Sequence, residues 1–182
     1  MSAKNARIDA ATESSPWDLV LTRTFDAPRE LVFQAWTDPK HMALWWGPDG
    51  CTNPVCEVDA RVGGAIRIDM RAPNGVVYPM SGRFEEISEP ERLVFISSAL
   101  DANGKSMFDI LNTVLFEEQS GKTVLTLQAR VMKATVEAPQ YLKGMEVGWT
   151  QSLGRLGAYL GSMRAKAGGP YVAEKEKGKE KE

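Results

Sequence analysis

The chain has 182 residues, a formal net charge of −2 and 43% hydrophobic residues, which is about one globular domain's worth of sequence. This charge balance, without a Lys/Arg cluster interleaved with aromatic residues, argues against a nucleic-acid partner. No apolar run approaches the roughly 20 residues of a membrane helix, and Met1–Ser15 lacks the apolar core of a secretory signal. We therefore expect a cytoplasmic protein that does not bind a membrane.

The N-terminal quarter predicts a strand followed by two short helices. Residues 1–15 are polar and aperiodic and are expected to be a disordered leader. Trp17–Phe25 alternates like a strand, and Asp26-Ala27-Pro28 then provides a cap and a first-turn proline for a short helix. Thr37-Asp38-Pro39 repeats this pattern for a second helix, which Trp45-Trp46-Gly47-Pro48 ends.

From residue 55 onward the apolar residues recur with a period of two, which indicates strands. Ile66, Ile68 and Met70 alternate with three charged residues, so one face of that strand should be dry and the other wet. A bend is expected near Pro79 or Gly82, because both residues disturb a ladder. Short connections favour an antiparallel meander of the strands Val55–Asp59, Ala65–Arg71, Val76–Ile87, Leu93–Ser98, Phe108–Glu118 and Thr123–Val131.

The segment Gln140–Met163 predicts one long amphipathic helix. Its apolar stripe has steps of three and four residues and consists of Leu142, Met145, Trp149, Leu153, Leu156, Leu160 and Met163. Five glycines interrupt the segment, and each costs a helix interior roughly 0.5–1 kcal/mol relative to alanine. Such a helix needs tertiary contacts, and we expect a curved sheet to wrap around it.

The last residues change in composition. Gly168-Gly169-Pro170 breaks structure, and Glu174–Glu182 consists almost entirely of Lys, Glu and Gly. The predicted organisation is a leader over residues 1–15, one domain over residues 16–163 and a disordered tail over residues 164–182.

The sequence offers little for metal or catalytic chemistry. A closed zinc site needs four ligands, and the sequence offers only Cys51, Cys56 and the single histidine, His41. We therefore expect both cysteines to be reduced, and we expect no metal or cofactor. Glu57 and Asp59 share a strand face and could act as a general acid–base pair. Solvated strands carry such pairs routinely, and we therefore assign no catalytic residue.

Several motifs, in this order, resemble one family. They are Phe25–Phe33, Thr37–Pro39, Trp45–Pro48, Asp59–Gly64 and Gly148–Leu153, followed by Arg155-Leu156 and Tyr159-Leu160. Together they resemble the START-like superfamily called SRPBCC, in the branch named for the activator of the heat-shock-protein-90 ATPase. The resemblance covers about residues 17–162.

The resemblance implies an α+β helix-grip fold: a curved seven-stranded antiparallel sheet around a long C-terminal helix, with two short helices after the first strand. In related families an apolar small molecule lies between sheet and helix. The family name also suggests a chaperone partner. The eukaryotic activators are similar only in their C-terminal part and carry a further N-terminal domain, whereas some 16 residues precede the first strand here. A chaperone partner is therefore not our first expectation.

We expect the protein to bind a hydrophobic or amphipathic small molecule in a cavity lined by Trp36, Trp45, Trp46, Ile66, Ile68, Met70, Tyr78, Met80, Phe84, Phe95, Asn112, Trp149 and Leu153. Asn112 is the candidate polar group, although Leu111 and Leu115 make the opposite face of its strand equally apolar. The alternative is that these residues fill a core. Two rival functions remain, a cyclase or hydratase that uses the same cavity and a module that stimulates a chaperone ATPase. A homodimer is compatible with the sequence.

Overall fold

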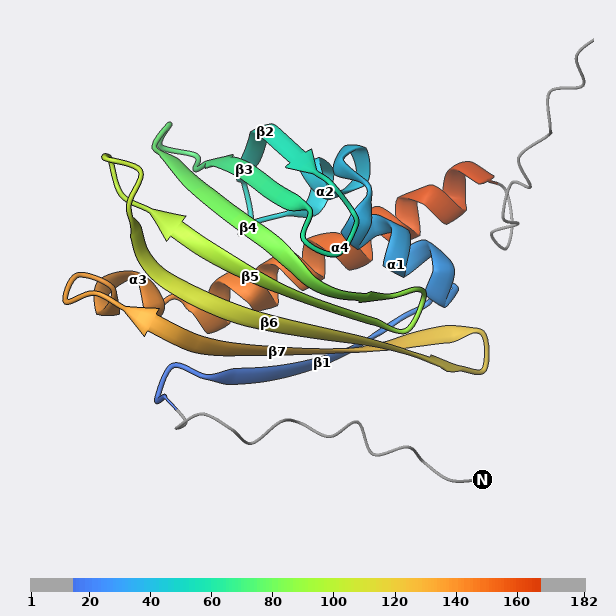
Figure 1. Ribbon diagram of the computed structural model, residues 1–182. Helices are drawn as coiled ribbons and strands as arrows, with labels where there is room; N and C mark the ends of the chain where they lie inside the picture. Colours follow the sequence, from blue (N-terminus) through green and yellow to red (C-terminus); the bar gives the residue numbers. More distant parts are fainter. Residues whose placement is uncertain (1–14, 168–182) are drawn as a thin grey trace, which may run out of the picture.

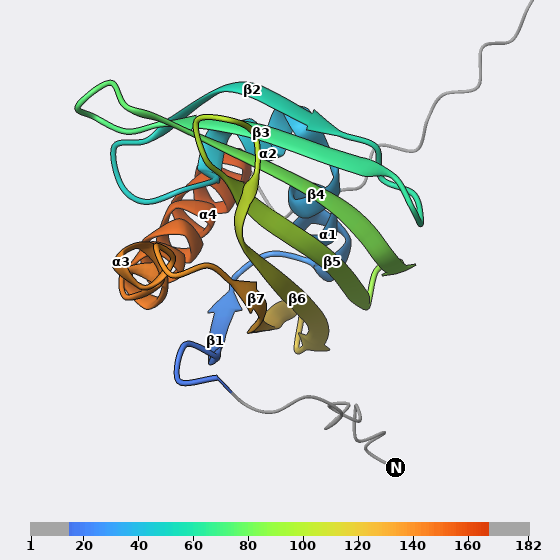
Figure 2. The ribbon, with the colours of Figure 1, turned by 60° about the vertical axis from the view of Figure 1, so that its left-hand side comes forward.

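The computed structural model describes residues 15–167. Most of the predicted leader and most of the predicted tail lie outside these residues. A seven-stranded antiparallel sheet in the order β1-β7-β6-β5-β4-β3-β2 curves around one long helix (Figures 1 and 2). Its strands are β1 (Leu19–Phe25), β2 (Thr52–Val58), β3 (Ala65–Arg71), β4 (Val77–Ser88), β5 (Arg92–Leu100), β6 (Ser106–Gln119) and β7 (Lys122–Ala134). The helices are α1 (Arg29–Thr37), α2 (Pro39–Trp45), α3 (Pro139–Leu142) and α4 (Met145–Ala167). The predicted helix-grip fold is confirmed.

The period-two pattern of β3 gives the expected two faces. Ile66 and Ile68 are buried, while Arg67 lies on the exposed side, so this strand presents its apolar side chains to the concave face of the sheet. The hairpin from β3 to β4 turns through Gly75, whose φ of 85° is readily adopted by glycine. The irregularity in β4 lies close to the second of the two predicted positions. Pro79 and Gly82 both pair regularly with β3, and the register shift against β5 lies just beyond Gly82, between Phe84 and Glu86.

The two short helices begin at the predicted motifs, Asp26-Ala27-Pro28 and Thr37-Asp38-Pro39, but only the second helix has the predicted side-chain cap. At α2 the Asp38 carboxylate accepts a hydrogen bond of 2.9 Å from the Lys40 N–H, and Pro39 occupies the first turn. At α1 the N-cap residue is Pro28, without a side-chain hydrogen bond, so the expected Asp26 cap does not form. Asp26 instead pairs with Arg164 of α4 at 2.6 Å.

The predicted long helix is divided into α3 and α4. The break falls at Gly144, whose N–H donates to the Tyr141 carbonyl at 3.2 Å, three residues back instead of four. Glycine has no side chain to pack and the greatest backbone entropy to lose, which explains a break at this position. The apolar stripe nevertheless holds, because Leu153, Leu156 and Leu160 are all buried.

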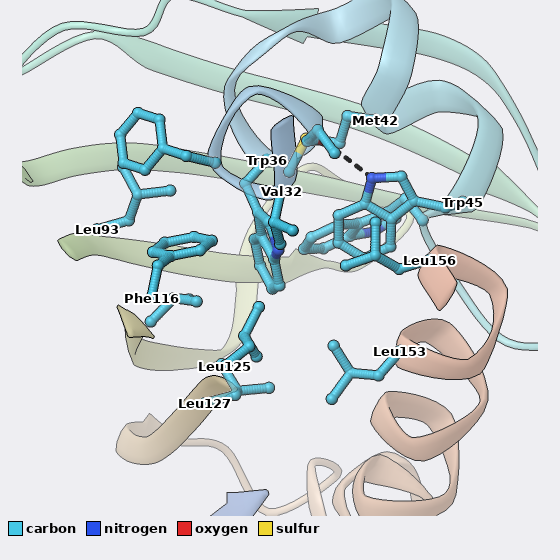
Figure 3. Close-up of a cluster of buried hydrophobic side chains, with 14 of the residues drawn as sticks. Val32, Trp36, Met42, Trp45, Leu93, Phe116, Leu125, Leu127, Leu153 and Leu156 are labelled. Carbon is cyan, nitrogen blue, oxygen red and sulfur yellow. Dashed lines mark hydrogen bonds between the residues drawn. The ribbon is translucent and has the colours of Figure 1, made fainter. Parts of the chain in front are cut away.

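Near α1 and α2 a cluster of buried apolar side chains occupies the space between sheet and helix. Leu153 and Leu156 of α4 belong to the same buried cluster as Leu125 and Leu127 of β7 (Figure 3). Trp36 of α1 is fully buried among them, and its ring lies near those of Trp45, Trp46, Phe95, Phe116 and Trp149. The two short helices therefore close this end of the curved sheet as a hydrophobic plug.

Candidate functional site

The other end of the same space is hollow. A chamber of about 280 Å³ lies between the N-terminal part of α4 and strands β5 and β6, and a second chamber of about 230 Å³ continues toward the ends of β3–β6. We call them the helix-side and the hairpin-side chamber, and together the hollow. Both chambers share the lining residues Trp46, Met70, Ser97, Phe108 and Tyr141. Each volume is close to the lower limit, roughly 300 Å³, of typical small-molecule sites.

Two tryptophans form the boundary between the filled core and the hollow. Trp46 and Trp149 both line the helix-side chamber, and their ring centroids are 5.2 Å apart at 81°. Behind them, Trp36 stacks on Trp149 with centroids 5.9 Å apart and ring planes 19° apart. This aromatic wall rests on the packed core, which fixes its position.

The floor of the hollow follows from the register of β5 and β6. Paired residues on the concave face step along the two strands in the order Leu93↔Val114, Phe95↔Asn112, Ser97↔Ile110 and Ala99↔Phe108. The first two pairs are buried in full or nearly so, whereas the last two line the chambers. The hollow therefore begins where large side chains on β5 give way to Ser97 and Ala99.

Arg155 fixes the loop that carries Trp46. Its Nη1 donates to the carbonyls of Trp46, Gly47 and Pro48 at 2.9, 3.0 and 3.1 Å. Its Nη2 donates to the carbonyls of Leu44 and Cys51 at 3.3 and 3.0 Å. One guanidinium on α4 thus satisfies five carbonyls at the end of α2 and holds the loop against the helix.

The hollow has few polar groups, and one of them is linked to a buried amide. Asn112 is fully buried, and its Nδ2 donates to Ser97 Oγ at 2.8 Å. Ser152 also lines the helix-side chamber, but its hydroxyl donates to the Gly148 carbonyl one turn back at 2.8 Å. The Tyr141 hydroxyl belongs to the rim, since this side chain is 41% exposed.

Charge is lacking in the lining. Among the described residues that line either chamber there is no Asp, Glu, Lys, Arg or His. The groups with shifted pKa values lie elsewhere: burial raises the pKa of the Cys56 thiol to about 11, and burial together with Asp38 raises the pKa of the Tyr159 phenol. Tyr159 hydrogen-bonds to His41 Nδ1, and neither residue lines the hollow.

The structure brings five of the thirteen predicted site residues to the hollow: Trp46, Met70, Tyr78, Met80 and Trp149. Asn112 lies directly behind the lining, through Ser97. The remaining seven fill the core beside it and are Trp36, Trp45, Ile66, Ile68, Phe84, Phe95 and Leu153. The alternative reading, that such residues simply pack the interior, thus describes these seven. Whether any of the thirteen binds a ligand stays a prediction.

The sequence interpretation missed much of the lining. Phe108 and Ile110 share the strand face of Asn112, and Leu142 and Met145 belong to the helix stripe, so these four carried a usable signal. Other lining residues had none, because small or polar side chains take no part in hydrophobic periodicity; they include Pro48, Ser97, Ala99 and Ser152.

The residues considered for acid–base catalysis and for metal binding do not form a site in the described part of the chain. Glu57 and Asp59 are exposed at β2 and do not line the hollow. Over residues 15–167 no group of three or more His, Cys, Asp or Glu side chains could hold a metal ion. No helix in this same range is both long enough and apolar enough to cross a membrane.

Comparison with known proteins places this geometry in a family. The sequence profile of the family described as activator of Hsp90 ATPase homolog 1-like protein matches residues 26–161. A solved structure from Chromobacterium violaceum is 32% identical with a TM-score of 0.65, and the match covers 80% of this chain and 98% of that one. A protein from Nitrosomonas europaea is 27% identical with a TM-score of 0.68, covering 81% and 96%.

A third solved structure, the AHSA1 protein from Silicibacter pomeroyi, is 26% identical with a TM-score of 0.69, and the match covers 80% of this chain and 99% of that one. No curated protein matches the chain significantly. The segment matched by the family profile includes both short helices, β2–β7 and most of α4, and therefore all residues that line the hollow. The chain belongs to the activator of Hsp90 ATPase homolog 1-like family, a branch of the SRPBCC superfamily.

Proposed function

We propose that this protein binds a hydrophobic or amphipathic small molecule in the hollow between the sheet and α3–α4. The observation that supports the proposal most directly is the lining of the two adjoining chambers near α3. Their walls are uncharged and mostly apolar, and the Trp46–Trp149 pair that bounds the helix-side chamber rests on the packed core. Pockets for small molecules are typically lined in this way, by apolar and aromatic side chains with a few polar groups.

The chemistry of the lining supports a largely apolar, uncharged ligand. A buried carboxylate or ammonium group needs a partner of opposite charge, and no charged side chain lines either chamber among the described residues. The lining includes four methionines and two tryptophans, and Met70 can adapt its flexible side chain to ligands of different shape. Tyr78 and Tyr141, 39% and 41% exposed, lie where the hollow meets solvent.

The rival enzyme reading has one supporting observation, the buried amide of Asn112 behind the lining. A cyclase or hydratase would also need a general acid or base in contact with its substrate. The exposed Glu57 lies away from the hollow, and no Asp, Glu, His or Lys lines either chamber among the described residues. We therefore favour binding without transformation.

A substitution that blocks the hollow tests the proposal. A Cβ at Gly148 would lie 3.7 Å from Pro48 Cγ, an ordinary contact, so Gly148→Leu should fold and place its side chain in the helix-side chamber. Gly154→Leu is the matched control, because a Cβ at Gly154 meets open space on the exposed side of α4.

The assay is a panel of neutral lipophilic compounds, screened by thermal shift and by native mass spectrometry. We expect one-to-one complexes with the wild type and with Gly154→Leu, and at least tenfold weaker binding to Gly148→Leu. The proposal is wrong if no compound forms a complex with the wild type, or if Gly148→Leu binds as tightly as its control.

A further inference from the structure

We infer that the hollow selects a neutral ligand with a hydrogen-bond acceptor oxygen, such as a ketone or an ether, and that the Ser97 hydroxyl donates to this oxygen. Asn112 is then a positioning residue that directs the Ser97 hydrogen into the hollow. This inference rests on the proposed function and adds the class of ligand and the atom that recognises it.

The orientation of the Asn112 amide is fixed by its surroundings. Its Nδ2 lies 2.8 Å from Ser97 Oγ, 3.2 Å from the Ile110 carbonyl oxygen and 3.4 Å from the Phe95 carbonyl oxygen. Carbonyl oxygens only accept hydrogen bonds, so the side of the amide that faces them must be the NH₂ group. The flipped amide would place its own oxygen against both carbonyls.

The direction of the Ser97 hydrogen follows from this orientation. An amide NH₂ group donates and does not accept, so the Ser97 hydroxyl serves it as an acceptor and its own hydrogen must point elsewhere. The described residues offer that hydrogen no acceptor. Because Ser97 lines both chambers, the hydrogen is available to a molecule in the hollow.

The stability of the core does not explain Asn112. The amide is fully buried between Ile110 and Val114 on one strand, and its Oδ1 has no hydrogen-bond partner within the described part of the chain. A buried acceptor without a partner costs stability, so an apolar side chain would satisfy packing better at this position. Polarising and orienting Ser97 is a role that an apolar residue could not perform.

The recognised atom should belong to an uncharged group. Ser97 offers one neutral donor, and no cation lines either chamber among the described residues, so a carboxylate would lose its hydration without an ionic partner. The hollow should therefore bind a ketone more tightly than an alkene of the same shape. It should also bind the ketone more tightly than the corresponding carboxylate.

Three naphthalenes, substituted at the same carbon with an acetyl, an isopropenyl or a carboxylate group, test this inference by isothermal titration calorimetry. The first two differ only in a carbonyl oxygen replaced by a CH₂ group. Ser97→Ala should lower the preference for the acetyl compound over the isopropenyl compound by about 2- to 10-fold, the equivalent of one neutral hydrogen bond. Ser97→Thr, which keeps the hydroxyl, should restore the preference.

Ser152→Ala is the matched control, since its hydroxyl hydrogen is already donated to a helix carbonyl, and it should leave the preference unchanged. Asn112→Leu should lower the preference as Ser97→Ala does while the isopropenyl compound binds as before, a pattern that a merely structural defect would not give. If Asn112→Leu does not fold, the two Ser97 variants still decide.

The outcomes separate this inference from the proposed function. A preference that is equal in the wild type and Ser97→Ala, with all compounds bound, overturns the inference and leaves the proposed function intact. Carboxylate binding as tight as acetyl binding likewise overturns it. If neither neutral naphthalene binds the wild type while other lipophilic compounds do, the inference alone is wrong; if no compound of either set binds, the proposed function fails first.

Discussion

Replacing Arg155 by leucine is expected to destabilise the whole domain, although the residue lies outside the hollow. Its guanidinium donates to the carbonyl of Leu44 in the last turn of α2 and to four carbonyls of the loop that follows. Two of these, Trp46 and Pro48, keep a second donor when the guanidinium is removed. Gly47 and Cys51 are buried, and among the side-chain and loop hydrogen bonds of the described residues their carbonyls have no other donor.

The expected magnitude follows from those two carbonyls. A hydrogen bond to a charged group contributes about 1.5–3 kcal/mol, and a buried acceptor left alone costs about 1–3 kcal/mol. The values are not additive, because the loop can relax and water can enter, and we take about 3 kcal/mol for Arg155→Leu. For a domain of this size that loss lowers the Tm by about 6–12 °C.

Urea unfolding followed by tryptophan fluorescence measures this loss, since Trp36, Trp45 and Trp46 are buried in the native state. Arg23→Leu is the control: its guanidinium makes a single exposed bond of 3.3 Å to the Thr150 carbonyl of the same helix, and its loss should cost less than about 0.5 kcal/mol. The reasoning would be refuted by an Arg155→Leu protein within about 1 kcal/mol of the wild type.

Three further predictions concern the core, the helix and a thiol. Leu153→Ala should lower the free energy of unfolding by about 2–5 kcal/mol in urea, because the side chain is fully buried between α4 and the sheet; an effect below 1 kcal/mol would contradict the packing described. Gly154→Ala should raise the free energy of unfolding by about 0.5–1 kcal/mol, since its Cβ meets open space in a helix, and a lower Tm would argue against this. Burial raises the pKa of Cys56 from its ordinary value near 9 to about 11, so its proton is held more tightly in the folded state. The free energy of unfolding should therefore fall as the pH rises from 9 through 11, and Cys56→Ala should flatten this slope, whereas an unchanged slope would show that other groups cause it.

Much of the fold could be predicted because its causes are local and periodic. Ile66 and Ile68 on one strand, and Leu153 and Leu156 on the helix, reveal their faces by spacing alone. The start of α2 could also be predicted, because the cap Asp38 and the first-turn Pro39 are adjacent in the sequence. The Gly144 break was not predicted, since the apolar stripe runs through it and the cost of one glycine is small beside tertiary packing.

The hollow could not be located from the sequence for a different reason. Periodicity predicts which residues of a strand face the interior. It does not predict whether such a residue contacts the helix on the other side or leaves a space. Phe95 and Ser97 have the same parity on β5, yet one is packed and the other lines a cavity. That difference depends on the register with β6 and on the distance to α4, both of which are long-range properties.

The loop held by Arg155 has a consequence for how the hollow can change size. Arg155 holds the loop that carries Trp46 against α4. The tryptophan wall of the hollow therefore cannot move without breaking several hydrogen bonds at once. The opposite side ends in hairpin tips at residues 72–76 and 101–105, whose hydrogen bonds stay within each tip, with none to α3 or α4 in the described chain. If the hollow binds ligands as proposed, we therefore expect the hairpin tip at residues 101–105, and not the tryptophan wall, to move when the length of the ligand changes.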